Sequence, residues 1–129
     1  MSTVPDGLLF TAEHEYVKKT DDASVVRIGI TDYAQGELGD VVYVELPKPG
    51  AVFGRMDAFG TIEAVKAVSE LFAPLAGTVV AVNGALEGDP ALVNRDPYGA
   101  GWMITLRIEN PADTAMLLGS AEYKKHIGE

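Results

Sequence analysis

The sequence predicts a mostly β domain, a sandwich or barrel that carries a few short helices. Short runs rich in valine, isoleucine and tyrosine recur at close spacing along the 129 residues. Turn-forming residues separate these runs, with 14 glycines and 7 prolines in the chain. Because 47% of the residues are hydrophobic, the chain can bury one sizeable core, and we expect a single domain over residues 1–129.

Five β-prone runs are the predicted strands: His14–Lys19, Ser24–Ile30, Val41–Leu46, Gly77–Val82 and Gly101–Ile108. The polar stretch Thr20–Ala23 predicts a hairpin turn between the first two strands. A second turn is predicted at Leu46–Gly50, because two prolines fix φ there and a glycine closes the turn.

The helical signals are short. Thr31 is a predicted N-cap for a helix over Asp32–Leu38, and Gly39 is its predicted end. Asp89 followed by Pro90 predicts an N-cap with proline at the first helical position, opening one or two turns through residues 91–94. After Pro111 we expect two short helices that are broken at Gly119, with Ser120 as the N-cap of the second.

The charge and the missing cysteine exclude several classes of function. A formal net charge of −9 argues against nucleic acid or an anionic membrane as a partner, since both require a basic face. An acidic surface instead suits docking on basic patches of proteins. The chain has no cysteine, so disulfides, thiolate nucleophiles and cysteine zinc sites are excluded. With no apolar run of membrane-spanning length and no signal-peptide pattern, we expect a soluble intracellular protein.

Conventional catalysis is hard to build from this sequence. His14 and His126 are the two histidines, and neither lies in a recognisable nucleophile or metal motif. We interpret His126 as a residue near a helix C-terminus that meets the negative end of the helix dipole. His14 is either a strand-surface residue without a task or part of a site.

The segment "GTIEAVKAVSELFAPLAG", residues 60–77, is locally ambiguous. Lys66 is the only basic residue between Arg55 and Arg95. Apolar residues at steps of three, with Glu63 and Glu70 beside Lys66, favour a surface helix in which the lysine belongs to an ion pair. The flanking glycines and Pro74, and the strand-like run that follows, favour strands instead.

Five blocks in a specific order carry a resemblance to a known family. They are "HEYV" from His14, "GITDYAQGELGDVVYVELPKPG", "EAVKAVSELFAPLAGTVVAVN", "DPALVNRDPYGAGWMI" and "AEYKKHI". Over nearly the whole chain the sequence resembles the H protein of the glycine cleavage system, a family of lipoyl-bearing carriers. The resemblance implies a barrel-sandwich hybrid of the lipoyl and biotinyl carrier type, with short helices that include C-terminal ones. It also implies a β-hairpin over Thr61–Ala73 with lipoate attached covalently to its tip residue, Lys66.

The resemblance further implies the chemistry and the partners. A pyridoxal-phosphate-dependent glycine decarboxylase loads an aminomethyl group onto the lipoyl arm, a tetrahydrofolate-dependent aminomethyltransferase removes it, and dihydrolipoamide dehydrogenase reoxidises the dithiol. A lipoate ligase or lipoyl transferase modifies the lysine. The carrier itself catalyses none of these steps and needs no metal. We expect a cytoplasmic monomer, located in the mitochondrial matrix only if a transit peptide has been removed.

The resemblance implies that the loaded arm folds back into a surface cleft. Glu15 would meet the amine there, and His14 and Glu70 would belong to the same cleft; the alternative is that Glu15 is an ordinary solvated strand residue. Two departures from the family pattern concern this region: Tyr16 stands where tryptophan is common, and Ala64 where serine is common.

Two other functions remain open from the sequence. One is an H-like relay protein that donates lipoyl groups to other lipoyl domains without serving glycine oxidation. The other is a plain β-barrel interaction module whose lysine is never modified.

Overall fold

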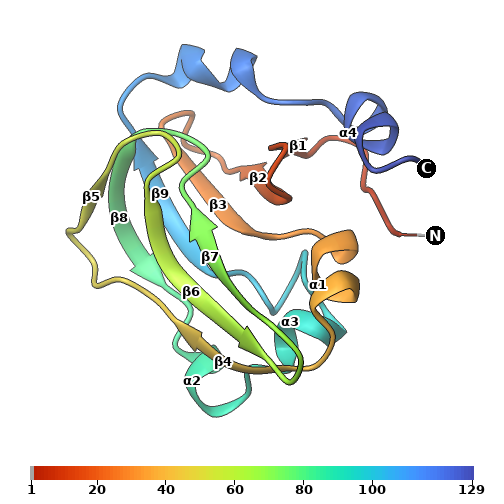
Figure 1. Cartoon of the computed structure of the whole chain (residues 1–129). Helices are drawn as coiled ribbons and strands as arrows, with labels where there is room; N and C mark the ends of the chain where they lie inside the picture. The colour runs from red at the N-terminus through yellow and green to blue at the C-terminus, as the bar shows by residue number, and fades with distance from the viewer. Residues whose placement is uncertain (1) are drawn as a thin grey trace.

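Two antiparallel β-sheets face each other in the computed structural model, which describes residues 2–129 (Figure 1). The larger sheet has the strand order β1-β2-β3-β9-β8-β5. Its strands are β1 (Leu9–Phe10), β2 (Glu15–Lys19), β3 (Val25–Ile30), β5 (Val52–Phe53), β8 (Gly77–Val82) and β9 (Ile104–Ile108). The smaller sheet has the order β4-β6-β7 and contains β4 (Val41–Glu45), β6 (Ala58–Ala64) and β7 (Val68–Phe72).

The main core lies between the two sheets. Val17 and Ile28 of the larger sheet belong to the same buried cluster as Val44, Ile62 and Leu71 of the smaller one. Inward and outward residues alternate along β9, where Ile104, Leu106 and Ile108 are buried. At β2 both faces of the larger sheet are covered, since Glu15, Tyr16 and Val17 are all buried. The predicted fold class, mostly β with a two-layer arrangement and short helices, is confirmed.

Three short helices connect strands: α1 (Asp32–Leu38), α2 (Ala85–Gly88) and α3 (Leu92–Arg95). The 3₁₀ helix η1 (Pro111–Met116) and α4 (Ser120–His126) follow the last strand. The prediction for α1 is confirmed at both ends. The Thr31 side chain accepts a hydrogen bond from the Ala34 amide, and Gly39 ends the helix with φ of 82°. Among the described residues, no helix combines the length and apolarity that crossing a bilayer requires.

Two predicted caps are wrong. Asp89 is the C-cap of α2, an element the sequence analysis did not predict, and α3 begins at Leu92 with Ala91 as its N-cap. The Asp89 carboxylate instead forms an ion pair with Arg95. At α4 the N-cap is Gly119 and Ser120 is already helical, because Glu122 accepts a hydrogen bond from the Gly119 amide and closes the first turn from inside.

Strand bounds differ from the predictions mainly at the ends. The first strand begins at Glu15, since His14 has a left-handed φ of 73°, which no strand residue adopts. The last strand begins at Ile104, because residues 97–101 form a turn and residues 102–103 lead out of it. The short strands β1 and β5 were not predicted; each contributes two residues at a sheet edge.

Residues 60–77 do not form the surface helix that their local pattern favours. They contribute to β6 and β7, which pair in the register Thr61↔Glu70, Ile62↔Ser69 and Glu63↔Val68. Packing explains the outcome, since this register directs Ile62 and Leu71 into the core between the sheets, where both are almost fully buried. The hairpin implied by the family resemblance is therefore present, with Lys66 in its turn.

A second, smaller core joins the two ends of the chain. Phe10, Tyr16 and Tyr123 are fully buried together, and the ring of Tyr123 stacks on that of Phe10 at 4.6 Å between centroids. Figure 1 shows α4 beside β1, with the two termini close to each other. This arrangement places the C-terminal helix against the segment that precedes β2.

Candidate functional site

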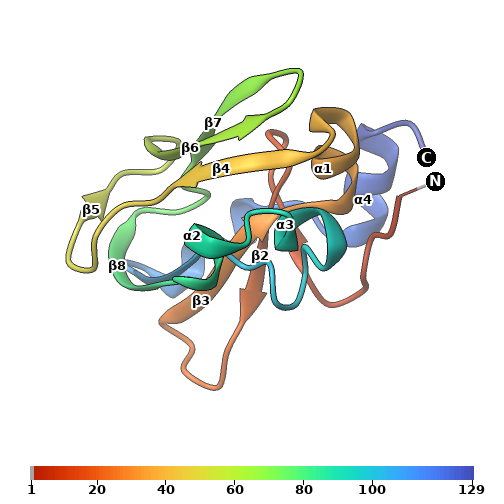
Figure 2. The same ribbon diagram turned by 90° about the horizontal axis from the view of Figure 1, so that it is seen from below.

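Lys66 lies in the exposed turn between β6 and β7, at the end of the hairpin that Figure 2 shows projecting from the molecule. The Ala64 amide donates to the Ala67 carbonyl at 2.7 Å and closes the turn. The Val65 amide donates to the Asp40 carbonyl at 3.0 Å, which ties the turn to the loop after α1. Among the described residues Lys66 makes no ion pair, so the ion-pair interpretation of this lysine is wrong.

Two neighbouring elements support the lysine. A Cβ atom built on Gly39 would lie 3.2 Å from Lys66 Cε, so the aliphatic stem of the lysine passes over this glycine at the end of α1. The loop around Gly39 is held by Asn94 of α3, whose amide group donates to the Gly39 carbonyl and accepts from the Val41 amide, both at 2.9 Å. The lysine therefore emerges from a turn with a defined position.

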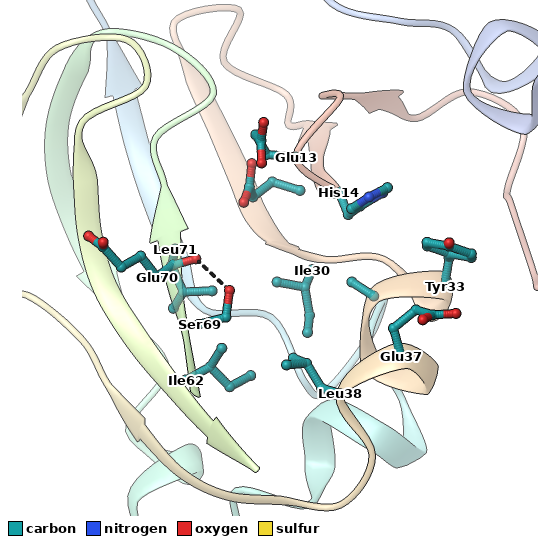
Figure 3. Close-up of a pocket in the computed structure, with 12 residues that line it drawn as sticks. Glu13, His14, Ile30, Tyr33, Glu37, Leu38, Ile62, Ser69, Glu70 and Leu71 are labelled. Atoms are coloured by element: carbon teal, nitrogen blue, oxygen red, sulfur yellow. Dashed lines mark hydrogen bonds between the residues drawn. The ribbon is translucent and has the colours of Figure 1, made fainter. Parts of the chain in front are cut away.

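A groove of about 290 Å³ lies beside this hairpin, between it and α1 (Figure 3). Three parts of the chain and one residue of β3 form its walls. They are the segment before and into β2 (Glu13, His14, Glu15), helix α1 (Tyr33, Ala34, Glu37, Leu38), the hairpin (Ile62, Ser69, Glu70, Leu71) and Ile30. The groove thus combines an apolar floor with several carboxyl groups, a combination that suits an apolar chain ending in a cationic group.

Glu15 is the most deeply buried acid of the groove, with 2% of its surface exposed. Its Oε1 accepts from the Thr11 hydroxyl at 2.7 Å, and its Oε2 lies 3.5 Å from the Phe72 amide that donates to it. Burial outweighs these hydrogen bonds and raises the pKa of Glu15 to about 8. The alternative in which Glu15 is a solvated strand residue is therefore wrong.

His14 lies at the rim of the groove and is half-buried. Its Nδ1 is 2.8 Å from the Tyr123 hydroxyl, and its ring packs against those of Tyr33 and His126. Burial, and next the positive charge of His126, lower the pKa of His14. The idea that His14 is an idle strand-surface residue does not fit this environment.

Glu70 lies at the edge of the groove but is exposed. Figure 3 shows its carboxylate directed away from the cavity, on the opposite side of β7 from Leu71. This follows from strand alternation, since Leu71 is buried in the core. The structure therefore brings Glu15 and His14 to one groove and leaves the Glu70 carboxylate on its outer side. Lys66 does not line the groove; it lies in the turn of the hairpin whose strands form one of the groove walls.

His126 is the last residue of α4, as predicted. Its Nε2 also donates to the Ala12 carbonyl at 3.0 Å, so the ring fastens the helix to the segment before Glu13. Among the described residues, no group of three or more histidine or acidic side chains could hold a metal ion.

The two departures from the family pattern are both buried. Tyr16 belongs to the second core, where its hydroxyl donates to the Pro97 carbonyl at 2.7 Å and its ring lies directly over Gly29. Ala64, at the end of β6, is 8% exposed. Neither side chain lies in the groove wall.

The sequence alone did not indicate several residues that shape the site. They are Thr11, Tyr33, Glu37, Ser69, Asn94, Tyr123 and Gly39, against which the Lys66 side chain lies. No local pattern marks them, because most of their contacts join residues that are far apart in the chain. Tyr123, for example, meets His14 across 109 positions of sequence.

Known proteins resemble this chain over almost all of its length. The family model described as "Glycine cleavage H-protein" matches residues 8–129. A glycine cleavage system H protein of Mycolicibacterium smegmatis is 58% identical, with all of both chains covered. One of Chlorobium limicola is 49% identical over 98% of this chain and 99% of its own. The crystal structure of a glycine cleavage system H protein from Mycobacterium marinum superposes with a TM-score of 0.86 at 35% identity, covering 98% of this chain and all of that one. The chain therefore belongs to the glycine cleavage H-protein family.

Proposed function

We propose that this chain serves the glycine cleavage system as its lipoyl carrier and that the lipoyl group is attached through an amide to Nζ of Lys66. Membership of the family makes the chain a carrier component of that system. The observation that carries the assignment to Lys66 is its place in a fixed, exposed turn of the hairpin whose strands form one wall of an acid-lined groove. When attached, the lipoyl group supplies a dithiolane whose sulfurs can accept and release a one-carbon group and electrons.

The residues around Lys66 fit this modification. The turn is held by backbone hydrogen bonds on both sides, so an acylating enzyme meets the lysine in one position. Val65 and Val68 flank it with 75% and 67% of their surfaces exposed, which leaves the neighbourhood free for an enzyme to approach. Because Lys66 is the only cation between Arg55 and Arg95, the hairpin offers no competing amine.

The lining of the groove suits binding of the end of the lipoyl arm away from water. Ile30, Ile62 and Leu71 offer an apolar floor, and Glu15 offers a carboxyl group that water reaches poorly. With a pKa of about 8, Glu15 holds its proton at neutral pH in the unmodified chain. A cationic amine beside it would favour the carboxylate, so Glu15 releases its proton and accepts a charge-assisted hydrogen bond.

In this proposal the chain catalyses no reaction itself. It presents the arm to a pyridoxal-phosphate-dependent glycine decarboxylase, a tetrahydrofolate-dependent aminomethyltransferase and dihydrolipoamide dehydrogenase, after a lipoate ligase or lipoyl transferase has modified it. Tethering raises the local concentration of the arm at each partner. We propose one lipoyl-carrier domain over residues 1–129, working as a monomer in the cytoplasm.

The relay function is not favoured, because the relatives described above all carry the name of the glycine cleavage H protein. A plain interaction module gives no reason for a solitary lysine on a hairpin that walls an acid-lined groove. Intact mass and peptide mapping of the protein from its native host test the proposal. We expect the mass of one lipoyl group on Lys66; a lipoyl group on Lys48 or Lys124, or none under conditions of active glycine cleavage, would contradict it.

A further inference from the structure

A chain of hydrogen bonds links the C-terminal helix to the groove. The Tyr123 hydroxyl lies 2.8 Å from Nδ1 of His14 and 2.7 Å from Oγ1 of Thr31. Thr31 and the whole Tyr123 side chain are fully buried, so these contacts do not compete with bulk water. Thr31 is also the N-cap of α1, the helix that forms one wall of the groove.

The direction of these hydrogen bonds can be derived. Thr31 Oγ1 accepts from the Ala34 amide at 3.2 Å, and its own proton then goes to the Tyr123 oxygen. The Tyr123 proton in turn goes to Nδ1 of His14, so each hydroxyl accepts once and donates once. In the opposite direction the Thr31 proton would have no acceptor among the described contacts, which is costly for a buried hydroxyl.

The same helix fastens the groove rim at a second point. His126 donates from Nε2 to the Ala12 carbonyl, two residues before His14. The backbone of His14 is fixed as well, because its amide donates to the Thr11 carbonyl and its carbonyl accepts from the Thr31 amide. These contacts hold His14 at φ of 73°, a conformation that a non-glycine residue adopts only when its surroundings impose it.

We propose that Tyr123 is a positioning residue for the groove, an inference that rests on the proposed function. Its hydroxyl donates to Nδ1 of His14 and leaves Nε2–H of that ring as the hydrogen-bond donor that the rim offers to the arm carried on Lys66. A neutral imidazole has one protonated nitrogen, so fixing the role of Nδ1 fixes that of Nε2. Glu15, the next residue in the chain, lines the same groove as His14.

The charged and titratable groups around His14 are compatible with a neutral ring. His126 of α4 disfavours the protonated form, whereas Glu13 on its own segment and Glu37 of α1 favour it more weakly. The rings of Tyr33 of α1 and Tyr123 of α4 also lie against that of His14. Burial together with His126 therefore decides the balance, and the neutral ring needs a defined tautomer.

Nitrogen-15 NMR of the unmodified protein tests the geometry without any lipoyl group. In the wild type we expect His14 as the Nε2–H tautomer. In Tyr123→Phe, which keeps the ring stack on Phe10, we expect a mixture of tautomers and a higher pKa of His14, because the neutral form loses a hydrogen bond. Tyr98→Phe is the matched control, since the Tyr98 hydroxyl bonds to Thr3 and Asp32 instead. A wild-type Nδ1–H tautomer, which needs no variant to detect, or an unchanged His14 in Tyr123→Phe would overturn the proposal.

A second measurement tests the role toward the arm. In lipoylated, reduced protein we expect the arm thiols of Tyr123→Phe to react with iodoacetamide about two- to tenfold faster than those of the wild type, the effect of one weakened hydrogen bond. Tyr98→Phe should react at the wild-type rate. If the NMR changes appear and the alkylation rates stay equal, the proposed role of Tyr123 is overturned. The assignment of the lipoyl group to Lys66 fails separately, by the mass on that residue.

Discussion

The hydroxyl of Thr11 donates to Oε1 of Glu15 across 2.7 Å, and both side chains are buried. The same hydroxyl oxygen accepts a hydrogen bond from the Glu15 backbone amide at 3.1 Å, so two hydrogen bonds join these residues across a short turn. A carboxyl group in this position is held in place but poorly solvated. The free energy of burying this carboxyl group therefore depends on whether it is ionised.

The stability of the unmodified protein should fall between pH 5 and pH 8 because of Glu15. Its folded pKa of about 8 lies above the ordinary value of 4.5, so the folded chain binds this proton more tightly than the unfolded chain. The stabilisation is complete below pH 4.5 and is lost as the pH rises to 8. At pH 7 the loss from this group amounts to about 3 kcal/mol.

Urea unfolding of Glu15→Gln checks this expectation. Glutamine resembles the protonated acid in shape and cannot ionise, so the variant should lose much less stability between pH 5 and pH 7 than the wild type. Glu87→Gln, at an exposed position of α2, should keep the wild-type pH dependence. Equal slopes for Glu15→Gln and the wild type would show that Glu15 ionises freely in the folded chain.

Lys66→Arg should abolish lipoylation and leave the fold intact. The turn is exposed and held by backbone hydrogen bonds, so the substitution should change the free energy of unfolding by less than about 0.5 kcal/mol. A guanidinium is not an acceptor for the acyl group, so intact mass after incubation with a lipoate ligase, ATP and lipoate should show no addition. Lys48→Arg is the control and should be lipoylated like the wild type. Wild-type glycine decarboxylation by Lys66→Arg would refute the carrier assignment.

Docking on the glycine decarboxylase should weaken as salt is added. The net charge is −9, and acylation of Lys66 removes one more positive charge. Glu45 of β4 and Glu70 of β7 are the two cross-strand neighbours of Thr61 in β6, on the outer face of the smaller sheet. Strands β6 and β7 form the hairpin that carries Lys66. Because surface charges act mainly on the encounter rate, we expect the association rate constant to fall by about tenfold from 0.02 M to 0.5 M salt.

Glu70→Gln should reduce the salt dependence of this association, since its carboxylate faces outward. The same variant should leave the pH dependence of unfolding unchanged, because Glu70 does not share the buried position of Glu15. Stopped-flow association at several salt concentrations measures the first effect. A rate constant that does not respond to salt would exclude electrostatic steering.

The elements whose conformation is set by residues close to them in sequence were predictable. Helix α1 follows from its own caps, Thr31 and Gly39, and five strands were recognised from β-prone runs. The hairpin was not determined locally, because apolar residues at steps of three also fit a helix; the burial of Ile62 and Leu71 between two sheets decides the outcome. The resemblance to known carriers, and not the periodicity, directed attention to Lys66.

The groove was less predictable than the hairpin. The resemblance named Glu15 and His14, but their burial and partners depend on contacts with residues at the other end of the chain. The Tyr123 hydroxyl reaches His14 only because α4 packs on β1 and shares a core with Phe10. The predicted cap at Asp89 is wrong for a local reason, since its carboxylate pairs with Arg95, six residues further along the chain, instead of a helix amide.

Gly39→Ala should destabilise the protein, whereas Gly36→Ala in the same helix should stabilise it. Gly39 has φ of 82° and ψ of −158°, a combination that a residue with a Cβ adopts only at a cost of about 1–3 kcal/mol. Its new methyl group would also meet the Lys66 stem at 3.2 Å, which the flexible lysine can relieve by moving. Gly36 lies within α1, and a Cβ there meets nothing within 4 Å, so alanine should add about 0.5–1 kcal/mol. Urea unfolding of both variants gives the two signs, and lipoylation rates show whether the displaced lysine is still recognised. A Gly39→Ala variant as stable as the wild type would mean that this loop can adopt a different conformation. The position of the Lys66 side chain would then not be fixed by the end of α1.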